Sequence, residues 1–135
     1  MVRNTGISRI CSKEADIVSL HVPLTEKTKG MIGERELKMM RNSAILINVS
    51  RGEVVDEKAL VKVIREKWIS GAALDVFANE PPVGSELLEL KEYNVLFTPH
   101  IAGATNEARL RIIREAMENI ARALRGEEIK HVVSG

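Results

Sequence analysis

The stretch Ala44–Asp56, which reads AILINVSRGEVVD, decides the fold of this chain. Its first five residues form a short apolar run, of the kind that makes a strand buried on both faces. The run then breaks into polar residues that include Arg51, and the glycine that follows, Gly52, suits a tight turn. Asp56 is placed to act as the N-cap of a helix over EKALVKVIREK. The stretch therefore predicts a buried strand, a turn that carries an arginine, and a helix.

Three more apolar runs predict three more strands, and helical patterns lie between them. The runs are IVSLHVP, GAALDVF and NVLFTPH, at residues 17–23, 71–77 and 94–100. Helices are predicted at 34–40, at 56–67 and, as a long amphipathic segment between the N-cap Thr105 and Gly126, at about 106–125. Strands that alternate with helices favour a parallel sheet with right-handed crossovers. The sequence therefore predicts an α/β fold with a parallel sheet of about four strands and flanking helices.

Composition excludes several classes of partner. The chain has 135 residues, of which 44% are hydrophobic and 29% charged, as in an ordinary globular domain. A formal net charge of +1 and an aromatic content of 3% predict no nucleic-acid partner. No apolar run approaches the roughly 20 residues that a membrane helix needs, so we predict no membrane partner. The single cysteine, Cys11, fits a small buried hydrophobe in a reducing compartment, and we expect a cytoplasmic protein without a metal site.

Each predicted strand ends in residues whose side chains are suited to binding or catalysis. These are His21 and Pro23, then Asn48, Ser50 and Arg51, then Asp75 with Glu80 shortly beyond, and finally Pro99 and His100. Because parallel strands place their carboxyl ends at one edge of a sheet, these side chains can converge. A guanidinium binds a carboxylate through two parallel hydrogen bonds. An imidazole transfers a proton near neutral pH, and a carboxylate orients it. The strand ends therefore suit a redox or acid–base site.

Each of these side chains also has a structural interpretation. A strand-end arginine such as Arg51 suits a surface ion pair, and a histidine after proline suits a loop. Asp75 suits the cap of a turn, Glu80 a solvated loop charge, and His21 a satisfied core histidine. Spacing alone leaves both interpretations open, and only the joint placement of the residues favours a functional site.

Four strings resemble, in this order, the second half of the NAD-dependent D-2-hydroxyacid dehydrogenases. They are ADIVSLHVPLT, AILINVSRGEVVDEKAL, GAALDVFANEPP and NVLFTPHIAGAT. That family includes phosphoglycerate dehydrogenase and glyoxylate/hydroxypyruvate reductase, and the match runs from about Cys11 to Val133. The resemblance implies a partial Rossmann-like three-layer domain. It further implies that residues 1–135 are a single domain, the C-terminal half of an NAD-binding domain, without the substrate domain and the GxGxxG half.

The resemblance also implies roles for individual residues. The substrate would be a small 2-hydroxy or 2-oxo acid, and the cofactor NAD, with NADP not excluded. Arg51 matches the residue that binds the substrate carboxylate, His100 the proton donor and acceptor, and Glu80 its paired carboxylate. The matching cofactor-binding residues are Asp75 at the nicotinamide carboxamide, His21, Val22 and Pro23 on the adenosine side, and Asn48, Val49, Ser50 and Gly103 around the nicotinamide half.

Two alternatives to an enzyme that works unaided remain open. In the first, the chain would be a truncated, non-catalytic dimerisation or interaction module; in the second, a subunit that needs a separate N-terminal half. An exposed sheet edge invites pairing with another chain, and a homodimer is the simplest way to cover it. We therefore expect a homodimer, and the resemblance implies the same, because in that family the cofactor domain carries the dimer contact.

Overall fold

The computed structural model describes residues 13–132, so the expectations for Cys11 and its neighbours lie outside the described residues. The chain divides into two compact units, Met1–His100 and Ile101–Gly135. The first unit contains a parallel sheet in the order β1-β2-β3-β4. The strands are β1 (Ile17–Leu20), β2 (Ile45–Asn48), β3 (Gly71–Leu74) and β4 (Val95–Phe97).

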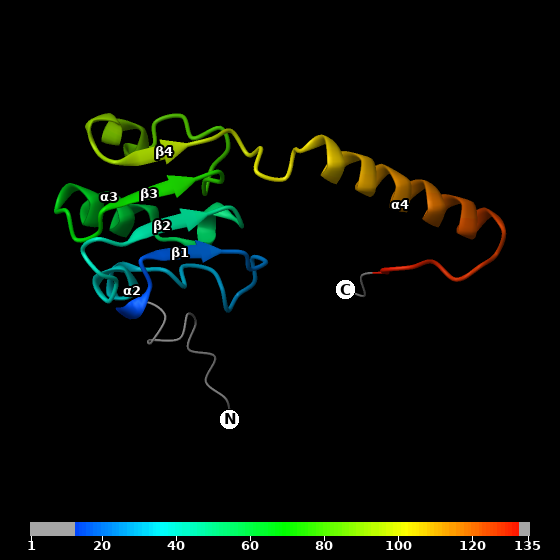
Figure 1. Cartoon of the computed structure of the whole chain (residues 1–135), viewed down its shortest axis with the longest axis horizontal. Coiled ribbons are helices and arrows are strands. Elements are labelled where there is room, and N and C mark those ends of the chain that lie inside the picture. The colour runs from blue at the N-terminus through cyan, green and yellow to red at the C-terminus, as the bar shows by residue number, and fades with distance from the viewer. Residues whose placement is uncertain (1–12, 133–135) are drawn as a thin grey trace, which may run out of the picture. The chain divides into compact units, whose positions relative to one another are not determined.

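The four strands run in one direction and end level with one another. Their last residues stand in a single row of the register, and all four arrows in Figure 1 point to the same side. The prediction of a parallel sheet of about four strands with flanking helices is confirmed. The consequence for function is that the segments after all four strands leave from one edge, the carboxyl edge.

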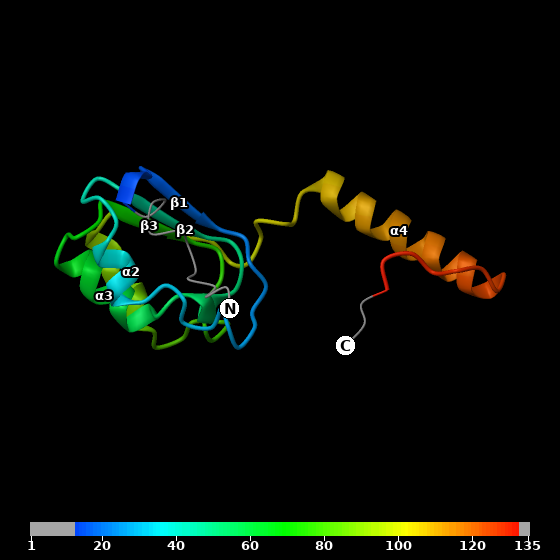
Figure 2. The ribbon, with the colours of Figure 1, turned by 90° about the horizontal axis from the view of Figure 1, so that it is seen from below.

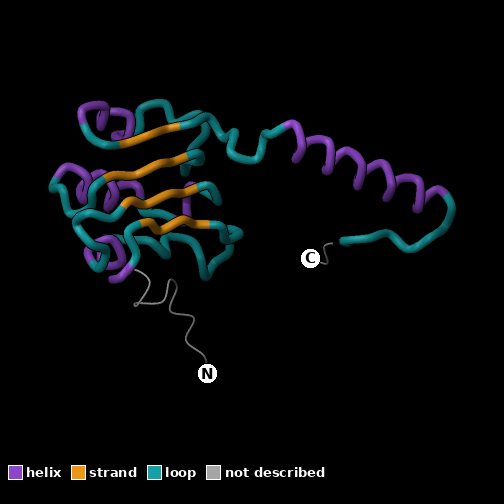
Figure 3. The backbone as a smooth tube through the Cα atoms, in the orientation of Figure 1, coloured by secondary structure: helices purple, strands orange, loops and turns teal. Residues whose placement is uncertain are grey.

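Three of the strands are shorter than the apolar runs predicted. β1 stops at Leu20, β3 at Leu74 and β4 at Phe97, and the residues that follow are loops (Figure 3). Proline contributes to this difference, because Pro23 and Pro99 have no N–H to donate to a ladder. The residues suited to binding or catalysis therefore lie on the loops at the carboxyl edge rather than inside the strands.

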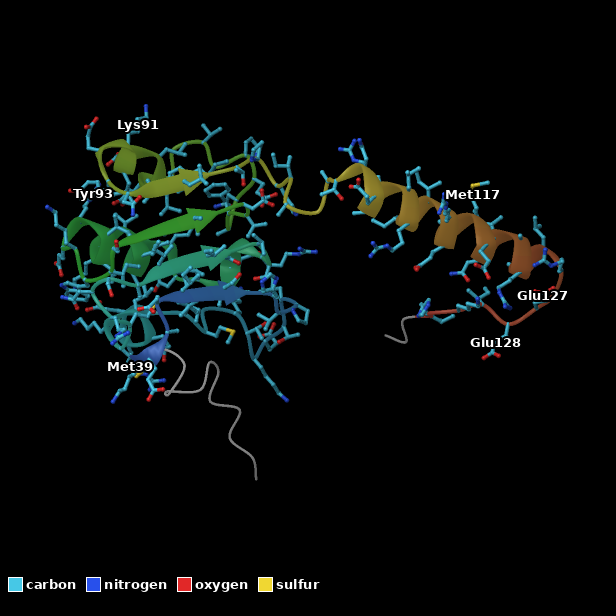
Figure 4. All side chains as sticks on the ribbon, in the orientation of Figure 1. Met39, Lys91, Tyr93, Met117, Glu127 and Glu128 are labelled. Atoms are coloured by element: carbon cyan, nitrogen blue, oxygen red, sulfur yellow. The ribbon has the colours of Figure 1, made fainter. Side chains whose placement is uncertain are left out.

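Helices cover one face of this sheet. α2 (Glu34–Lys38) and α3 (Glu57–Arg65) lie on the same side of the strands in Figure 2. Two 3₁₀ helices complete the unit, η1 (Gly52–Val54) and η2 (Glu86–Glu92). The apolar side of α3 packs into the core, which is built mainly from aliphatic side chains; its buried members are Ala59, Leu60, Val61, Val63 and Ile64. Met39 lies at the end of α2, and Lys91 and Tyr93 lie beside β4 (Figure 4).

Asp56 is the N-cap of α3, as the sequence predicts. Its Oδ1 accepts hydrogen bonds from the backbone N–H groups of Lys58, at 3.0 Å, and Ala59, at 3.1 Å. These two N–H groups have no partner within the helix, so the carboxylate satisfies donors that the first turn would otherwise leave open.

Asp56→Ala is therefore expected to lower the free energy of unfolding by about 1 kcal/mol. Urea denaturation followed by circular dichroism measures this change. Asp56→Asn retains an acceptor at the same position and should recover most of the loss, because asparagine is as good an N-cap as aspartate. An Asp56→Ala protein as stable as wild type would contradict the capping role.

The second unit contains α4 (Asn106–Leu124) and the segment after it. Thr105 caps the helix, its side chain accepting from the N–H of Ala108 at 3.1 Å, and Gly126 follows the helix with φ +69°. Both caps agree with the prediction. Met117 projects from α4 in Figure 4. By its spacing it belongs to an apolar stripe, which we interpret as a surface for covering a sheet: Ile113, Ala116, Met117, Ile120 and Leu124. Within residues 13–132, none of the helices combines the length and apolarity needed to cross a membrane.

Candidate active site

The turn after β2 is held by the buried side chain of Asn48. Its Nδ2 donates to the carbonyl oxygen of Arg51 at 2.9 Å. Its Oδ1 accepts from both the N–H and the hydroxyl of Ser50, at 3.0 and 2.8 Å. Asn48 and Ser50 are buried, whereas the side chain of Arg51 is exposed and donates through Nη1 to the carbonyl oxygen of Ser50 at 2.7 Å. The backbone of Arg51 is thus fixed from inside, and its guanidinium is available at the surface.

An open hollow of about 450 Å³ lies between the ends of β1 and β2. It brings Arg51 together with five of the residues that the family resemblance places at the cofactor; its lining is His21, Val22, Pro23, Leu24, Val49, Ser50 and Arg51. His21 is exposed, and its Nε2 is 2.8 Å from the hydroxyl of Ser19. The interpretation of His21 as a core histidine is therefore wrong, because no part of the core encloses it.

Glu80 and His100 form a hydrogen-bonded pair. Oε2 of Glu80 is 2.8 Å from Nδ1 of His100, and the second oxygen of Glu80, Oε1, accepts from the N–H of Phe77 at 3.0 Å. The hydrogen bond to His100, followed by that to Phe77, holds the pKa of Glu80 below its ordinary value of 4.5. Both side chains retain access to solvent. The pair therefore offers an ionised carboxylate that orients an imidazole at the carboxyl edge.

The backbone of His100 is held in an uncommon conformation. Its φ is +55°, in the left-handed region that residues other than glycine rarely occupy, and its N–H donates to the carbonyl oxygen of Asp75 at 2.9 Å. Such conformations persist where the surrounding structure imposes them, and they cluster at functional sites. The link to Asp75 joins the loop after β4 to the end of β3.

Asp75 is buried directly after β3, and its side chain contacts Thr98, the residue directly after the neighbouring strand β4. The hydroxyl of Thr98 donates to its Oδ1 at 2.5 Å, and its own N–H donates to the carbonyl oxygen of Asn48 at 3.0 Å. Sequence reasoning missed Thr98. The available signal was its place two residues before His100, at the end of the strand that neighbours the strand of Asp75.

The turn that carries Arg51 lies directly against the loop that leads to Glu80. A Cβ atom on Gly52 would overlap the backbone of Phe77 and the amide nitrogen of Ala78. Only glycine permits this approach of two backbones. Gly103, the remaining predicted site residue, belongs to the second compact unit. Among residues 13–132, no group of three His, Cys, Asp or Glu side chains is arranged to hold a metal ion.

Replacing Glu80 by glutamine should make the free energy of unfolding depend less steeply on pH under acidic conditions. The folded-state pKa of Glu80 is lowered, so the carboxylate stabilises the fold above pH 4.5 and loses that contribution as the pH falls through the folded-state pKa. Glutamine does not titrate, so the free energy of unfolding of Glu80→Gln should fall less steeply in this window. Urea titrations at neutral and acidic pH measure the difference between the two proteins. Identical pH profiles would contradict the pairing with His100.

Comparison with known proteins agrees with this geometry. Residues 7–102 match the family model of the D-isomer specific 2-hydroxyacid dehydrogenase, NAD binding domain. Glyoxylate reductase of Thermococcus litoralis is 53% identical over 115 residues, which are 85% of this chain and 34% of that protein. D-3-phosphoglycerate dehydrogenase of Methanocaldococcus jannaschii is 44% identical over 128 residues, 95% of this chain and 24% of that protein.

The same family appears among solved structures. The D-isomer specific 2-hydroxyacid dehydrogenase of Lactobacillus delbrueckii ssp. bulgaricus, in its NAD complexed form, superposes with a TM-score of 0.85 and 35% identity. The match covers 93% of this chain and 42% of that one. The chain thus spans about a third of the length of the relative from Thermococcus litoralis and less than half of this solved structure. The four strings quoted from the sequence and these matches lead to one conclusion: this chain belongs to the D-isomer specific 2-hydroxyacid dehydrogenase family, in the region of its NAD-binding domain.

Proposed function

We propose that this chain supplies the substrate-binding and proton-transfer residues of an NAD-dependent dehydrogenase. The reaction would interconvert a small D-2-hydroxy acid and the corresponding 2-oxo acid, with hydride exchanged with NAD(H). The observation that carries the proposal is the contact of 2.8 Å between Glu80 Oε2 and His100 Nδ1, at the same sheet edge as the fixed turn of Arg51. The names of the relatives, glyoxylate reductase and D-3-phosphoglycerate dehydrogenase, support the substrate class.

His100 is the proposed proton donor and acceptor. Because Nδ1 is engaged by Glu80, Nε2 is the ring nitrogen left to exchange a proton with the substrate oxygen. In the reduction, Nε2 donates that proton to the oxo oxygen; in the oxidation, it accepts the proton of the hydroxyl. The carboxylate of Glu80, whose pKa lies below its ordinary value, is ionised near neutral pH, and its hydrogen bond to Nδ1 fixes the orientation of the ring.

Arg51 is the proposed anchor of the substrate. Its guanidinium would bind the substrate carboxylate through two hydrogen bonds and would stabilise negative charge on the oxo oxygen during the reaction. The hydrogen bond from Asn48 Nδ2 to the Arg51 carbonyl oxygen fixes the backbone from which this side chain extends. Such pre-positioning reduces the ordering that the reaction requires.

The residues present suit the nicotinamide end of NAD. Asp75 is a buried carboxylate whose Oδ1 already accepts one hydrogen bond, from Thr98, and a carboxylate is the acceptor that a carboxamide NH₂ group requires. The hollow beside β1 and β2 would hold the adenosine side at His21 and Pro23. When bound, NADH supplies the hydride. These 135 residues contain no GxGxxG spacing, so the chain's own proposed cofactor contacts are those at the strand ends, with Gly103 assigned by resemblance.

We further propose that the chain forms a homodimer. The observation that supports the dimer, an unpaired edge strand, also favours a second candidate function, a non-catalytic interaction module. Among residues 13–132, β1 pairs with β2 on one side and has no neighbouring strand on the other, so it is an edge strand of the sheet. Its residue Ile17 is 59% exposed. An apolar, unpaired edge strand favours association with another chain. Sedimentation velocity tests this directly, and a strictly monomeric profile over a range of concentrations would contradict it.

A chimera separates the dehydrogenase from the interaction module. A segment of this chain that contains the matching 115 residues and extends through His131 replaces its counterpart in Thermococcus litoralis glyoxylate reductase. We expect the chimera to oxidise NADH when glyoxylate is added, followed by the loss of NADH absorbance. A chimera that folds and binds NADH but shows no glyoxylate-dependent oxidation would contradict the proposed function.

A further inference from the structure

The loop between β3 and Glu80 is held by a residue that lies far from it in the sequence. The backbone N–H of Ala78 donates to Oε1 of Glu57 at 2.7 Å, and the two residues are 21 positions apart. Glu57 is the first residue of α3, so the bond ties the start of that helix to the loop. Both partners are partly buried, which protects the hydrogen bond from competition with water.

The neighbouring amide in this loop contacts Glu80 itself. The N–H of Phe77 donates to Oε1 of Glu80, whose other oxygen contacts His100. Two successive amides of the loop, those of Phe77 and Ala78, therefore bind two different carboxylates. Because one of these carboxylates is Glu80, the placement of Glu80 beside His100 depends on the conformation of a backbone segment that Glu57 fixes.

The backbone of Phe77 and Ala78 is also confined by a second contact, with Gly52. Gly52 lies against the backbone of Phe77 and Ala78, so the loop cannot move toward the turn of Arg51 without a steric clash. Contact with Gly52 restricts the loop on the side of the Arg51 turn, and the Glu57 hydrogen bond ties the N–H of Ala78 to the start of α3.

Capping of α3 does not account for Glu57. A carboxylate in the first turn interacts favourably with the helix dipole, and that is its usual role. The capping hydrogen bonds of α3, however, are made by Asp56, which accepts from both Lys58 and Ala59. Oε1 of Glu57 is directed instead to a loop amide.

We propose that Glu57 is a positioning residue, which holds the Phe77–Glu80 loop so that Glu80 faces His100. This inference rests on the proposed function for its catalytic meaning, but its structural content is independent of cofactor and substrate. Glu57 acts through Ala78 and Glu80, and its own carboxylate takes no part in proton transfer.

The test is an NMR titration of the Glu80 side-chain carboxyl carbon against pH in the 135-residue chain. In the wild type, the hydrogen bonds from His100 and Phe77 keep the pKa of Glu80 below 4.5. Glu57→Ala releases the loop, so the pKa of Glu80 should rise toward 4.5. Glu57→Asp keeps the charge but shortens the side chain and should act in the same direction. Glu57→Gln keeps the acceptor oxygen at the same reach and should retain the wild-type titration.

Asp56→Ala is the matched control. It removes the cap of the same helix and destabilises the fold, but it leaves the Ala78–Glu57 hydrogen bond in place. Its Glu80 titration should therefore match the wild type. A wild-type titration in both Glu57→Ala and Glu57→Asp, or an equal rise of the Glu80 pKa in Asp56→Ala, would overturn the proposal. An inactive chimera with the expected titrations would instead contradict the proposed function and leave the positioning role intact.

Discussion

His100→Gln is expected to lower kcat/KM for glyoxylate reduction by the chimera about 10²- to 10⁴-fold. This is the range that a positioned general acid or base contributes to a reaction. Glutamine has a similar size and can still hydrogen bond to Glu80, so the loop should keep its structure. It cannot release a proton near neutral pH, and the oxo oxygen would therefore gain its proton only from water. The initial rate of NADH oxidation at subsaturating glyoxylate measures the loss.

The control for this substitution is His131→Gln. His131 lies in the segment after α4, in the second compact unit, and is exposed. The two variants introduce the same chemical change at different histidines, so only the change at His100 should affect the rate. A His100→Gln chimera that retains the wild-type rate would show that another group supplies the proton.

Gly52→Ala is expected to lower the free energy of unfolding by roughly 3 kcal/mol or more. The added Cβ would overlap backbone atoms of Phe77 and Ala78, and backbone cannot rotate aside as the end of a flexible side chain can. Relief of this overlap requires the turn of Arg51 to separate from the loop of Glu80. The variant should therefore lose both stability and, in the chimera, activity. Urea denaturation of the 135-residue chain measures the first effect.

Gly33→Ala provides the comparison for Gly52→Ala. A Cβ at Gly33 would meet Oε2 of Glu36 at 3.6 Å, an ordinary van der Waals contact, and its φ of −106° is open to any residue. The same methyl group added there should lower stability by no more than about 1 kcal/mol, the cost of replacing glycine by alanine at the N-cap of α2. Equal stabilities of the two variants would contradict the close approach at Gly52.

The features that the sequence predicts well are local ones. The strand at AILIN, the N-caps Asp56 and Thr105, and the glycine after the long helix follow from patterns within a few residues, because periodicity and capping are properties of short segments. The runs LHVP and LFTPH continue the apolar pattern of a strand beyond its hydrogen-bonded part. The pattern alone does not show where the ladder stops, which is why the predicted strands are too long.

The features that could not be predicted depend on the approach of distant segments. Spacing placed Glu80 and His100 at one edge, and only the family resemblance indicated that they form a pair. The contacts of Gly52 with the Phe77 loop, of Glu57 with Ala78 and of Thr98 with Asp75 join residues more than 20 positions apart. Such contacts follow from the register of neighbouring strands and the path of loops, and neither composition nor periodicity carries that information.

The central claim is that the carboxyl edge of the sheet is the site at which NAD(H) and a 2-oxo acid meet. It is tested most directly by titrating the ¹⁵N-labelled chain with NADH and recording its amide spectrum. We predict that the amides of Asn48–Arg51, Asp75 and His100 shift together, while those at the opposite ends of β2 and β3, such as Ile45 and Gly71, do not. No shift at millimolar NADH, or shifts confined to the hollow around Val83 between α3 and η2, would contradict the claim.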